Sequence, residues 1–498
     1  GRLRWSLAGP GWGETLCLTL WWQMHSVLKA SLPSVSVLGP ADEAYERERT
    51  ACWNKDVIHR PAAIVQPKNT NECAAAVRII GEGGYRLVIA GGRHGYDCMA
   101  EGAAVIDLSL MTAVRVDKTR ALVTVQGGAR LGHMDRACRE SGLACVTGTN
   151  PDTGVVGLSL AGGAGYLSRK HGLAVDNFVS AEVVLADGRV VLATHHNAER
   201  ELLWALQGGG SNFGVVTELT MKAHPINYVY GGQVLNLALR AATAAALLRE
   251  WREWILAAPR SVYSAAVLPC GAPVVPLVVM ETDQAAVSQA DRPKTQLSQV
   301  PSLATALGRC CVFGSCLSIR MTKRMQYHSE AQPMLESVQV PGHYYDCAYM
   351  LPELTDELIA VLVAYAREKH PNSQSAILIF PLGAAVAAKP VSETACVLGR
   401  GMPKGFWIII EGKFAPDKAG VNRAKVVSWA KGLRSELGRF GCKETAHTLD
   451  GNMADHLAKG EVSPSIYGSN TAAMAQLKAR YDPNNIFKCN RNIEPSSE

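Results

Sequence analysis

Three glycine-rich clusters in the first half of the chain have residue types suited to holding a phosphate-bearing ligand. They are Gly91-Gly92-Arg93-His94-Gly95, the stretch 148–165, and the run GGGSNFG at 208–214. Glycine lets the backbone approach a ligand closely and turn its N–H groups toward anionic oxygens. Three such loops in one region favour a ligand with a diphosphate, although each loop alone is equally consistent with a tight turn.

Several standard motifs are missing from these clusters. The chain has no GxxxxGK[ST] and no HExxH, and the two nearest matches to GxGxxG end in Phe213 and Ser168 instead of glycine. The stretch 157–161 (GLSLA) approaches the GxSxG elbow of the α/β-hydrolases, but Ala161 replaces the second glycine. A serine hydrolase that uses Ser159 is therefore kept only as an alternative function.

Short strands and helices alternate around the clusters between residues 57 and 222. Asn69 followed by Glu72 predicts a capped start for a helix over 71–82, and 131–140 predicts another. Asp187-Gly188 between two apolar runs predicts a β-hairpin. The predicted strands are 86–90, 103–108, 121–126, 181–186, 189–194 and 213–221.

The second half has a different pattern. Helical periodicity predicts helices over 241–257, 353–369 and 418–437, and apolar runs predict strands over 375–380 and 406–411. A last helix over 469–480 ends before Pro483, since proline cannot continue a helix. Residues 283–340 are poorly periodic and rich in Ser, Gln and Cys.

Composition indicates a large globular protein. The 498 residues are 48% hydrophobic and 19% charged, which excludes a disordered chain. The net charge is only +6 and no dense Lys/Arg stripe occurs, so we expect no nucleic-acid partner. The 14 cysteines are scattered, and Cys310, Cys311 and Cys316 lack the paired spacing of a zinc site, so we expect no metal and mostly reduced thiols.

The N-terminal segment shows no pattern from which a helix or a strand can be predicted. The apolar run 16–22 is shorter than the roughly 20 residues that a membrane span needs, and 11–14 interrupts it, so we expect neither a span nor a signal peptide. We expect residues 1–44 to be a disordered or non-native leader. The compartment is left open, with a cytoplasmic location favoured over secretion.

Several longer stretches together resemble the FAD-linked oxidases of the vanillyl-alcohol oxidase/PCMH type, and among them the berberine-bridge-enzyme-like oxidoreductases. They are Arg60-Pro61 with Val65-Gln66-Pro67, LVIAGGRHGYD (starting at Leu87), the long glycine-rich stretch 148–177, WALQGGGSNFGVVTELT at 204–220, and YDPNNIFKCNRNI at 481–493. The joint match covers about 45–225 and 465–493.

The resemblance implies an α+β fold. A PCMH-type FAD-binding domain of two α/β subdomains would span 45–224. A substrate-binding domain, with an antiparallel sheet covered by helices, would span 225–455. A C-terminal segment, 456–498, would return to the FAD domain. Pro381-Leu382-Gly383, Thr394-Ala395 and Arg400 resemble landmarks of the second domain, whereas 225–350 matches poorly.

The resemblance also implies FAD as cofactor. His94 stands where the family's histidine forms a covalent bond to the flavin, and Arg93 stands where a glycine is usual. Asn150 stands where doubly linked members have a cysteine, so we expect a single link, with no substitute from Cys145. The remaining implied FAD contacts are Gly91, Gly92, Gly95, Thr153, Gly154, Gly157, Asp176, Asn177, Gly214, Val215 and Asn490.

The implied reaction is oxidation of an alcohol, a sugar hemiacetal or a C–H bond next to nitrogen. Hydride passes to flavin N5, and O₂ or another acceptor reoxidises the flavin. A protein base must take up a proton. The family's tyrosine base is absent: Asp450 stands at its place, Glu411 is a second candidate, and Tyr344 and Tyr345 are a third. A flavin-binding protein that has lost catalysis is the other alternative.

Overall fold

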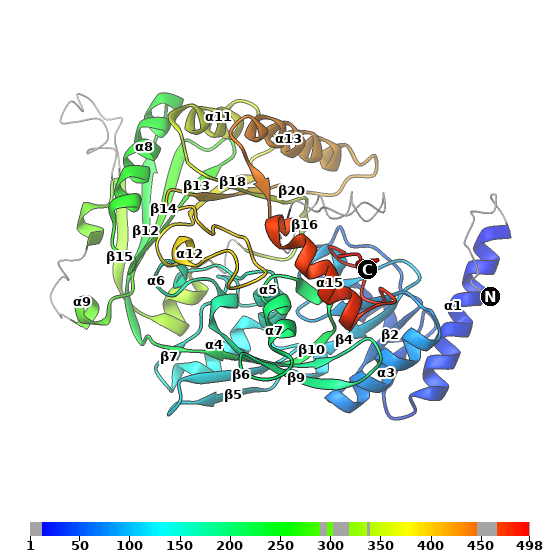
Figure 1. Cartoon of the computed structure of the whole chain (residues 1–498). Coiled ribbons are helices and arrows are strands. Elements are labelled where there is room, and N and C mark those ends of the chain that lie inside the picture. Colours follow the sequence, from blue (N-terminus) through cyan, green and yellow to red (C-terminus); the bar gives the residue numbers. More distant parts are fainter. Residues whose placement is uncertain (1–11, 289–295, 302–317, 336–338, 446–465, 498) are drawn as a thin grey trace, which may run out of the picture.

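Two small sheets build the first half of the molecule, in the lower part of Figure 1. The computed structural model describes residues 12–288, 296–301, 318–335, 339–445 and 466–497. In the first sheet β2, β4 and β3 run parallel, and β1 is antiparallel to β2. Its strands, in spatial order, are β1 (Ser36–Leu38), β2 (Ala63–Gln66), β4 (Ala104–Asp107) and β3 (Leu87–Ala90). Every residue of β2 and β4 is buried, as expected for parallel strands covered on both faces.

The second sheet is antiparallel throughout. Its strands, in spatial order, are β5 (Val114–Asp117), β6 (Leu122–Gln126), β10 (Val215–Lys222), β8 (Phe178–Val184) and β9 (Val190–Thr194). The hairpin predicted at Asp187-Gly188 is confirmed, because Val184 pairs with Val190 across the turn. Gly188 has a φ of 80°, which glycine adopts without strain.

Helices connect and cover these strands. The predicted cap of α3 (Thr70–Glu82) is confirmed, since the Asn69 side chain accepts a hydrogen bond from the Glu72 backbone at 3.0 Å. The other helices of this half are α2 (Tyr45–Thr50), α4 (Leu131–Arg139), α5 (Val155–Leu160), α6 (Ser168–His171) and α7 (Arg200–Leu206).

The segment expected to be a disordered leader is instead ordered from α1 (Trp12–Ser31) onward. Leu28 is fully buried, and it packs with Val37 and Val77 in the core of the first sheet. Apolar residues without clear periodicity hid this helix from the sequence pattern. No helix in the described ranges has both the length and the apolar character needed to cross a bilayer.

The second half contains one large antiparallel sheet, to which eight of the described strands belong. In spatial order they are β15 (Ser318–Gln326), β12 (Tyr228–Leu237), β14 (Val274–Glu281), β13 (Val262–Pro269), β18 (Ala376–Pro381), β19 (Phe406–Glu411), β17 (Cys347–Leu351) and β21 (Lys443–Glu444).

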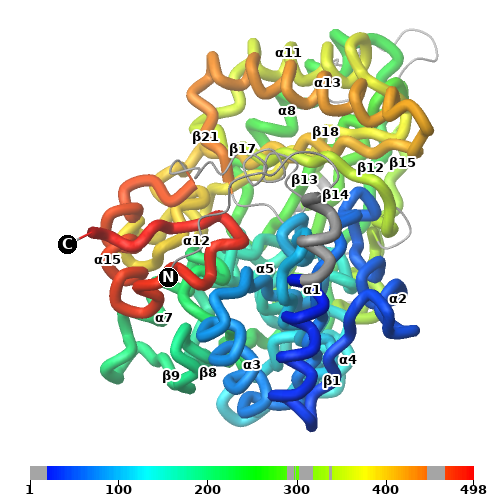
Figure 2. The backbone as a smooth tube through the Cα atoms, turned by 90° about the vertical axis from the view of Figure 1, so that its right-hand side faces the viewer, coloured from blue at the N-terminus to red at the C-terminus, as the bar shows by residue number. Residues whose placement is uncertain are grey.

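Three helices cover one face of this sheet, as Figures 1 and 2 show along the top of the molecule. They are α8 (Ala241–Ala257), α11 (Asp356–Arg367) and α13 (Val421–Gly438). Alternate residues of β19, Phe406, Ile408 and Ile410, pack against them in one buried cluster. The prediction of an α+β fold with an antiparallel sheet covered by helices is confirmed. Because side chains alternate along a strand, Trp407, Ile409 and Glu411 point toward the first half of the molecule.

The end of the chain returns to the first half. Helix α15 (Thr471–Tyr481) packs against α7, and it lies between the two halves in Figure 1. The ammonium of Lys478, fully buried, donates to the backbone oxygens of Asn212 and Phe487 at 2.7 and 2.9 Å. It also donates to the Asp482 carboxylate at 2.7 Å. A buried charge of this kind is stable only while it stays paired.

This clamp leads to a stability prediction. Lys478→Met leaves the Asp482 carboxylate buried without its cation, so we expect the free energy of unfolding to fall by about 3–5 kcal/mol in urea denaturation. Lys488→Met, at an exposed position on the same segment, is the matched control. The double variant Lys478→Met/Asp482→Asn should recover part of the loss because no charge is left unpaired. Equal stability of the Lys478 and Lys488 variants would contradict the argument.

Candidate active site

Two glycine loops meet backbone to backbone at the centre of the site. A β-carbon on Gly92 would overlap the backbone nitrogen of Gly154, and one on Gly154 would lie 2.6 Å from the nitrogen of Gly92. Only glycine at both positions permits this approach. The contact fixes the loop that carries His94 against the loop that carries Thr153.

A cleft between the loops, which we name the loop cavity, encloses about 900 Å³, part of it open to solvent. Its walls include the predicted contacts Gly91, Gly92, Arg93, His94, Gly95, Thr153, Gly154, Gly157 and Gly214. Space over two glycines is open: a β-carbon on Gly157 or on Gly210 would meet no atom within 4 Å. Arg491 adds a cation to the wall. The Asp97 carboxyl is also part of the wall. A long, narrow ligand such as a flavin dinucleotide fits this lining, which combines glycine backbone with two arginines.

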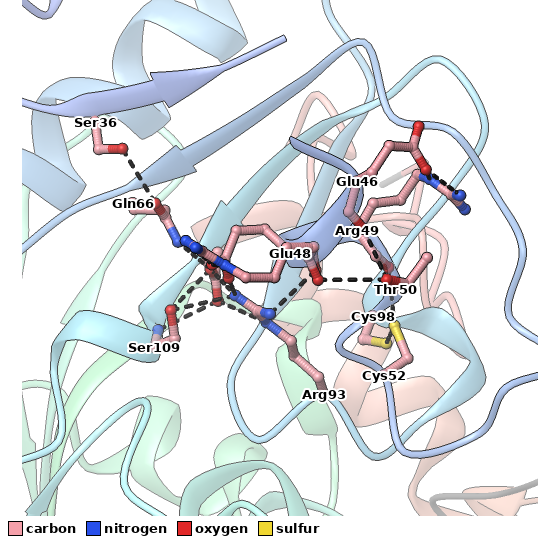
Figure 3. Close-up of polar contacts among 12 residues, drawn as sticks. Ser36, Glu46, Glu48, Arg49, Thr50, Cys52, Gln66, Arg93, Cys98 and Ser109 are labelled. Carbon is pink, nitrogen blue, oxygen red and sulfur yellow. Dashed lines mark hydrogen bonds and ion pairs between the residues drawn. The ribbon is translucent and has the colours of Figure 1, made fainter. Parts of the chain in front are cut away.

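Arg93 has a different role from the glycine that is usual at its position. Its backbone is left-handed, with a φ of 56°, and its guanidinium is buried. Figure 3 shows the side chain of Arg93 beside Glu48, to which its guanidinium donates a hydrogen bond. The guanidinium also forms an ion pair with the Asp107 carboxylate. The Glu48 distance is 2.9 Å, and Ser109 lies 3.3 Å away. Two carboxylates already balance this charge, so Arg93 anchors the loop instead of contributing a cation to the cavity.

His94 is held on two sides. The indole of Trp53 stacks on the imidazole with 4.4 Å between ring centroids and 20° between planes. The Thr153 hydroxyl lies 3.2 Å from His94 Nε2. These contacts fix the plane and the rotation of the imidazole at the edge of the loop cavity.

A second cavity, which we name the sheet cavity, lies between the loops and the large sheet and encloses about 1310 Å³, part of it open to solvent. The walls of both cavities share His94, Thr153, Leu158 and Ala161. The two spaces therefore meet at the histidine. On the sheet side the wall is aromatic, formed by Tyr263, Tyr344, Phe380 and Trp407.

Glu411 stands at the end of β19 and lines the sheet cavity. Burial raises the pKa of its carboxyl to about 7, while Lys413 acts in the opposite direction. Next to it, Asp346 accepts a hydrogen bond from the backbone of Gly412 at 3.0 Å, which fixes the turn that follows Glu411. The geometry thus places a carboxyl that titrates near neutral pH on the wall facing His94.

The two tyrosines that form the third base candidate lie in different surroundings. Tyr344 lines the sheet cavity, but its hydroxyl donates to the backbone oxygen of Val340, and burial raises its pKa. Tyr345 is fully buried in the core beneath the helices. Asp450, the first candidate, lies outside the described residues, as do Cys310, Cys311 and Cys316.

Other predicted contacts lie behind the cavity walls. Asp176 forms a buried ion pair with Arg400 at 2.6 Å, and Asn177 holds His224 at 2.9 Å. Val215 is in the core of the first sheet. Asn490 donates to the hydroxyl of Ser211, which lines the loop cavity, at 3.1 Å. Among the described residues, these four support the walls and do not form them.

Three further residues bear on a second flavin bond and on the alternative of a serine hydrolase. Asn150 lines the sheet cavity and accepts a hydrogen bond from the Asp152 backbone, so no thiol stands at this place. Cys145 is buried away from both cavities, in the core of the second sheet. The Ser159 hydroxyl is fully buried and has no hydrogen-bond partner within the described part of the chain, so it lacks the adjacent base that a serine nucleophile needs.

Sequence reasoning missed Trp53, Asp346 and Arg491. Trp53 is 41 positions before His94, and no local pattern links the two. Asp346 follows two tyrosines in a segment without clear periodicity. Arg491 could have been predicted as a residue of the cavity wall, because it is a cation within the C-terminal motif 481–493 and this motif was expected to return to the FAD domain.

Family models and relatives agree with this geometry. A model described as "FAD binding domain" matches residues 61–194, and one described as "Berberine and berberine like" matches residues 452–494. An FAD-linked oxidoreductase of Dictyostelium discoideum is 28% identical over 92% of this chain and 94% of its own. A xylooligosaccharide oxidase of Thermothelomyces thermophilus is 36% identical, over 41% of this chain and 42% of its own.

A solved structure shares the whole fold. Glucooligosaccharide oxidase of Acremonium strictum, described with a 6-S-cysteinyl, 8α-N1-histidyl FAD, superposes with a TM-score of 0.78. The match covers 95% of this chain and all of that chain, at 22% identity. Likeness at this identity shows the arrangement of the domains and leaves substrate to the residues of the site.

The open space over Gly157 leads to a prediction about cofactor binding. In Gly157→Leu the new side chain fills the loop cavity, and overpacking of about 1–3 kcal/mol lowers flavin affinity about ten- to hundredfold. The ratio of flavin to protein absorbance in the purified protein measures the loss.

Gly438→Leu is the matched control, because this residue is also helical with open space over its β-carbon, but it faces solvent. Full flavin content in the Gly157 variant would show that the cofactor lies elsewhere.

Proposed function

We propose that the chain is an FAD-linked oxidoreductase of the vanillyl-alcohol oxidase/PCMH type with a berberine-bridge-like C-terminal segment. We further propose that it oxidises a hydroxyl-bearing small molecule with Glu411 as base. The observation that carries the proposal is the meeting of the loop cavity and the sheet cavity at His94. When bound, FAD supplies a hydride acceptor at N5, and O₂ or another acceptor restores it.

His94 is proposed to hold the flavin through one covalent bond. The stacked indole of Trp53 and the hydroxyl of Thr153 keep the imidazole at the junction of the cavities, so the ring needs no reorientation to bond. Asn150 has no sulfur to form a second bond. Covalent attachment by one side chain fixes the cofactor and adjusts its electronic properties.

Glu411 is proposed to accept the hydroxyl proton of the substrate. A base is most effective when its pKa lies near the working pH, and burial brings this carboxyl to about 7. Asp346 holds the backbone beside it, so the carboxylate keeps its place at the cavity wall. Asp450 stays as the second candidate for this role.

The cavity walls favour a ring-shaped or otherwise flat substrate. Trp407 and Phe380 come from neighbouring strands, and their ring centroids are 5.7 Å apart. Aromatic faces of this kind pack against apolar surface of a ligand, while polar groups fix its orientation.

The proposed base favours one kind of reaction. Oxidation of an alcohol or a hemiacetal needs removal of an O–H proton, whereas a C–H next to an amine nitrogen can lose hydride without loss of such a proton. The presence of Glu411 therefore favours the hydroxyl substrates.

A covalent link at His94 predicts colour that survives acid. Acid-precipitated protein should stay yellow, and a flavin-bearing peptide in a tryptic digest should contain His94. His94→Ala should release all flavin into the acid supernatant, whereas His133→Ala, at a histidine outside both cavities, should not. Colourless acid-precipitated wild-type protein after expression with ample flavin would disprove the link.

A base at Glu411 predicts a particular pH profile. The carboxyl must be ionised to accept a proton, so kcat/KM should rise as pH increases through about 7 and should be lost below it. An unshifted glutamate would keep activity down to about pH 4–5. Glu411→Gln should lower kcat about 10²–10⁴-fold and abolish this acidic limb.

Glu393→Gln, at an exposed glutamate, is the control and should change neither kcat nor the acidic limb of the pH profile.

A screen of alcohols, sugars and amines, in which reduction of the flavin is followed by absorbance, identifies the substrate. Bound flavin that no member of the panel reduces would favour the alternative of lost catalysis, and an unchanged profile in Glu411→Gln would transfer the role to Asp450.

A further inference from the structure

Two cysteines face each other beside the loop that carries His94. Cys52 follows α2, and Cys98 ends a short 3-10 helix (Tyr96–Cys98) directly after that loop. Their sulfur atoms are 3.6 Å apart although 46 positions separate them in sequence, and Figure 3 shows them side by side. Both side chains are buried. A disulfide needs an S–S distance of about 2.0 Å, so the two sulfurs must approach each other from their present separation for a bond to form.

The surroundings of Cys52 favour a thiolate. The hydrogen bond from Cys98 is the largest influence and lowers the pKa of Cys52. Burial and the negative charge of Asp107 oppose this shift, whereas the positive charges of Arg93 and Lys55 lower the pKa further. The pKa of Cys98 is raised, by its hydrogen bond to Cys52 and by burial. One thiol of the pair is therefore suited to attack, and its neighbour stays protonated beside it. Low-pKa thiols with a second cysteine nearby are the ones that oxidise selectively.

A second close pair in the chain lacks this charge arrangement. Cys138 and Cys145 are both buried in the core of the second sheet and share a hydrogen bond. The pKa of Cys145 is raised by the Cys138 bond, by burial and by the negative charge of Asp135. No positive charge is among the influences on Cys145, so this pair serves as an internal reference.

A route for a small oxidant exists on one side of the first pair. Cys98 is part of the wall of the loop cavity, together with Gly95 and Asp97. Cys145 and Cys138 line neither of the two cavities described above. In protein whose loop cavity is not filled by the cofactor, hydrogen peroxide that enters this cavity reaches Cys98, and the Cys52 sulfur lies 3.6 Å behind it.

We propose that Cys52 and Cys98 are a peroxide-sensitive thiol pair whose disulfide ties the segment after α2 to the cofactor loop. The Cys52 thiolate attacks one oxygen of hydrogen peroxide, the O–O bond breaks, and Cys52 becomes a sulfenic acid while hydroxide leaves and takes up a proton. The Cys98 sulfur then attacks the Cys52 sulfur, the S–O bond breaks, and water leaves. In total two thiols and one peroxide give one disulfide and two waters.

The bond would restrain the surroundings of His94. Trp53, next to Cys52, stacks on His94, and its backbone N–H donates to the backbone oxygen of Arg93 at 2.9 Å. The disulfide closes a loop that contains Trp53, Arg93 and His94, and so holds the stacked pair together even when the polar contacts around it open. A crosslink of this length restricts the unfolded chain and raises the unfolding temperature.

Peptide mapping of the full-length protein tests the proposal, and it does not depend on the proposed function because the peroxide is added from outside. The protein is reduced with dithiothreitol, desalted and treated with hydrogen peroxide. Free thiols are then blocked with N-ethylmaleimide, and a non-reducing digest is examined by mass spectrometry. The Cys52 and Cys98 peptides should appear joined, with the loss of two hydrogen atoms, about tenfold faster than Cys138 and Cys145 lose their free thiols.

Two variants sharpen the result. In Cys98→Ser the sulfenic acid on Cys52 has no partner, so it should be trapped by dimedone, and the rise in unfolding temperature seen on oxidation of the wild type should vanish. Cys138→Ser, the matched control, should still form the Cys52–Cys98 disulfide and show the rise. The proposal is overturned if Cys52 and Cys98 stay alkylated while other cysteines oxidise, or if Cys52 proceeds to sulfonic acid without a crosslink in the wild type.

Discussion

The close approach of Gly92 and Gly154 is the constraint on which the rest of the site depends. Side chains at either position would push the two loops apart. With the loops in contact, His94 lies within hydrogen-bond distance of Thr153. The loop cavity and the sheet cavity then have four wall residues in common, His94 and Thr153 among them. Arg93 secures the same loop from behind, because its guanidinium is held by Asp107 and Glu48. Backbone packing and a buried ion cluster thus set one position, that of the imidazole.

The large sheet supplies the opposite wall by simple alternation. Along β19, one set of side chains joins the core beneath the helices and the other set forms the sheet cavity. The same burial that keeps Trp407 and Ile409 away from bulk water also raises the pKa of Glu411. Stability and reactivity here come from a single arrangement, in which a half-buried carboxyl at the end of an apolar strand lines the sheet cavity.

Local sequence predicted the elements well where a local signal exists. The cap at Asn69, the hairpin at Asp187-Gly188 and the helix over 241–257 each depend on residues a few positions apart, and the structure has all three. The glycine loops and His94 were predicted as cofactor contacts from local motif and spacing, and in the structure many of these residues line the loop cavity. The stack of Trp53 on His94 and the Asp176–Arg400 ion pair were not predicted, since they join residues 41 and 224 positions apart. Helix α1 was missed because its apolar residues follow no clear period, and its buried residues Met24 and Leu28 pack against the first sheet, which the local sequence does not reveal.

The return of the C-terminal segment has a consequence for the order in which the protein becomes competent. Arg491 lines the loop cavity, and the backbone N–H of Ile493 donates to Asn212 at 2.9 Å. Translation proceeds from the glycine loops toward these residues, so the loops emerge from the ribosome roughly 280 to 400 residues before the wall that closes them. The cavity in which we propose that the cofactor binds is therefore completed late in synthesis. A nascent or prematurely terminated product would present the histidine and the glycines without the arginine that completes their enclosure.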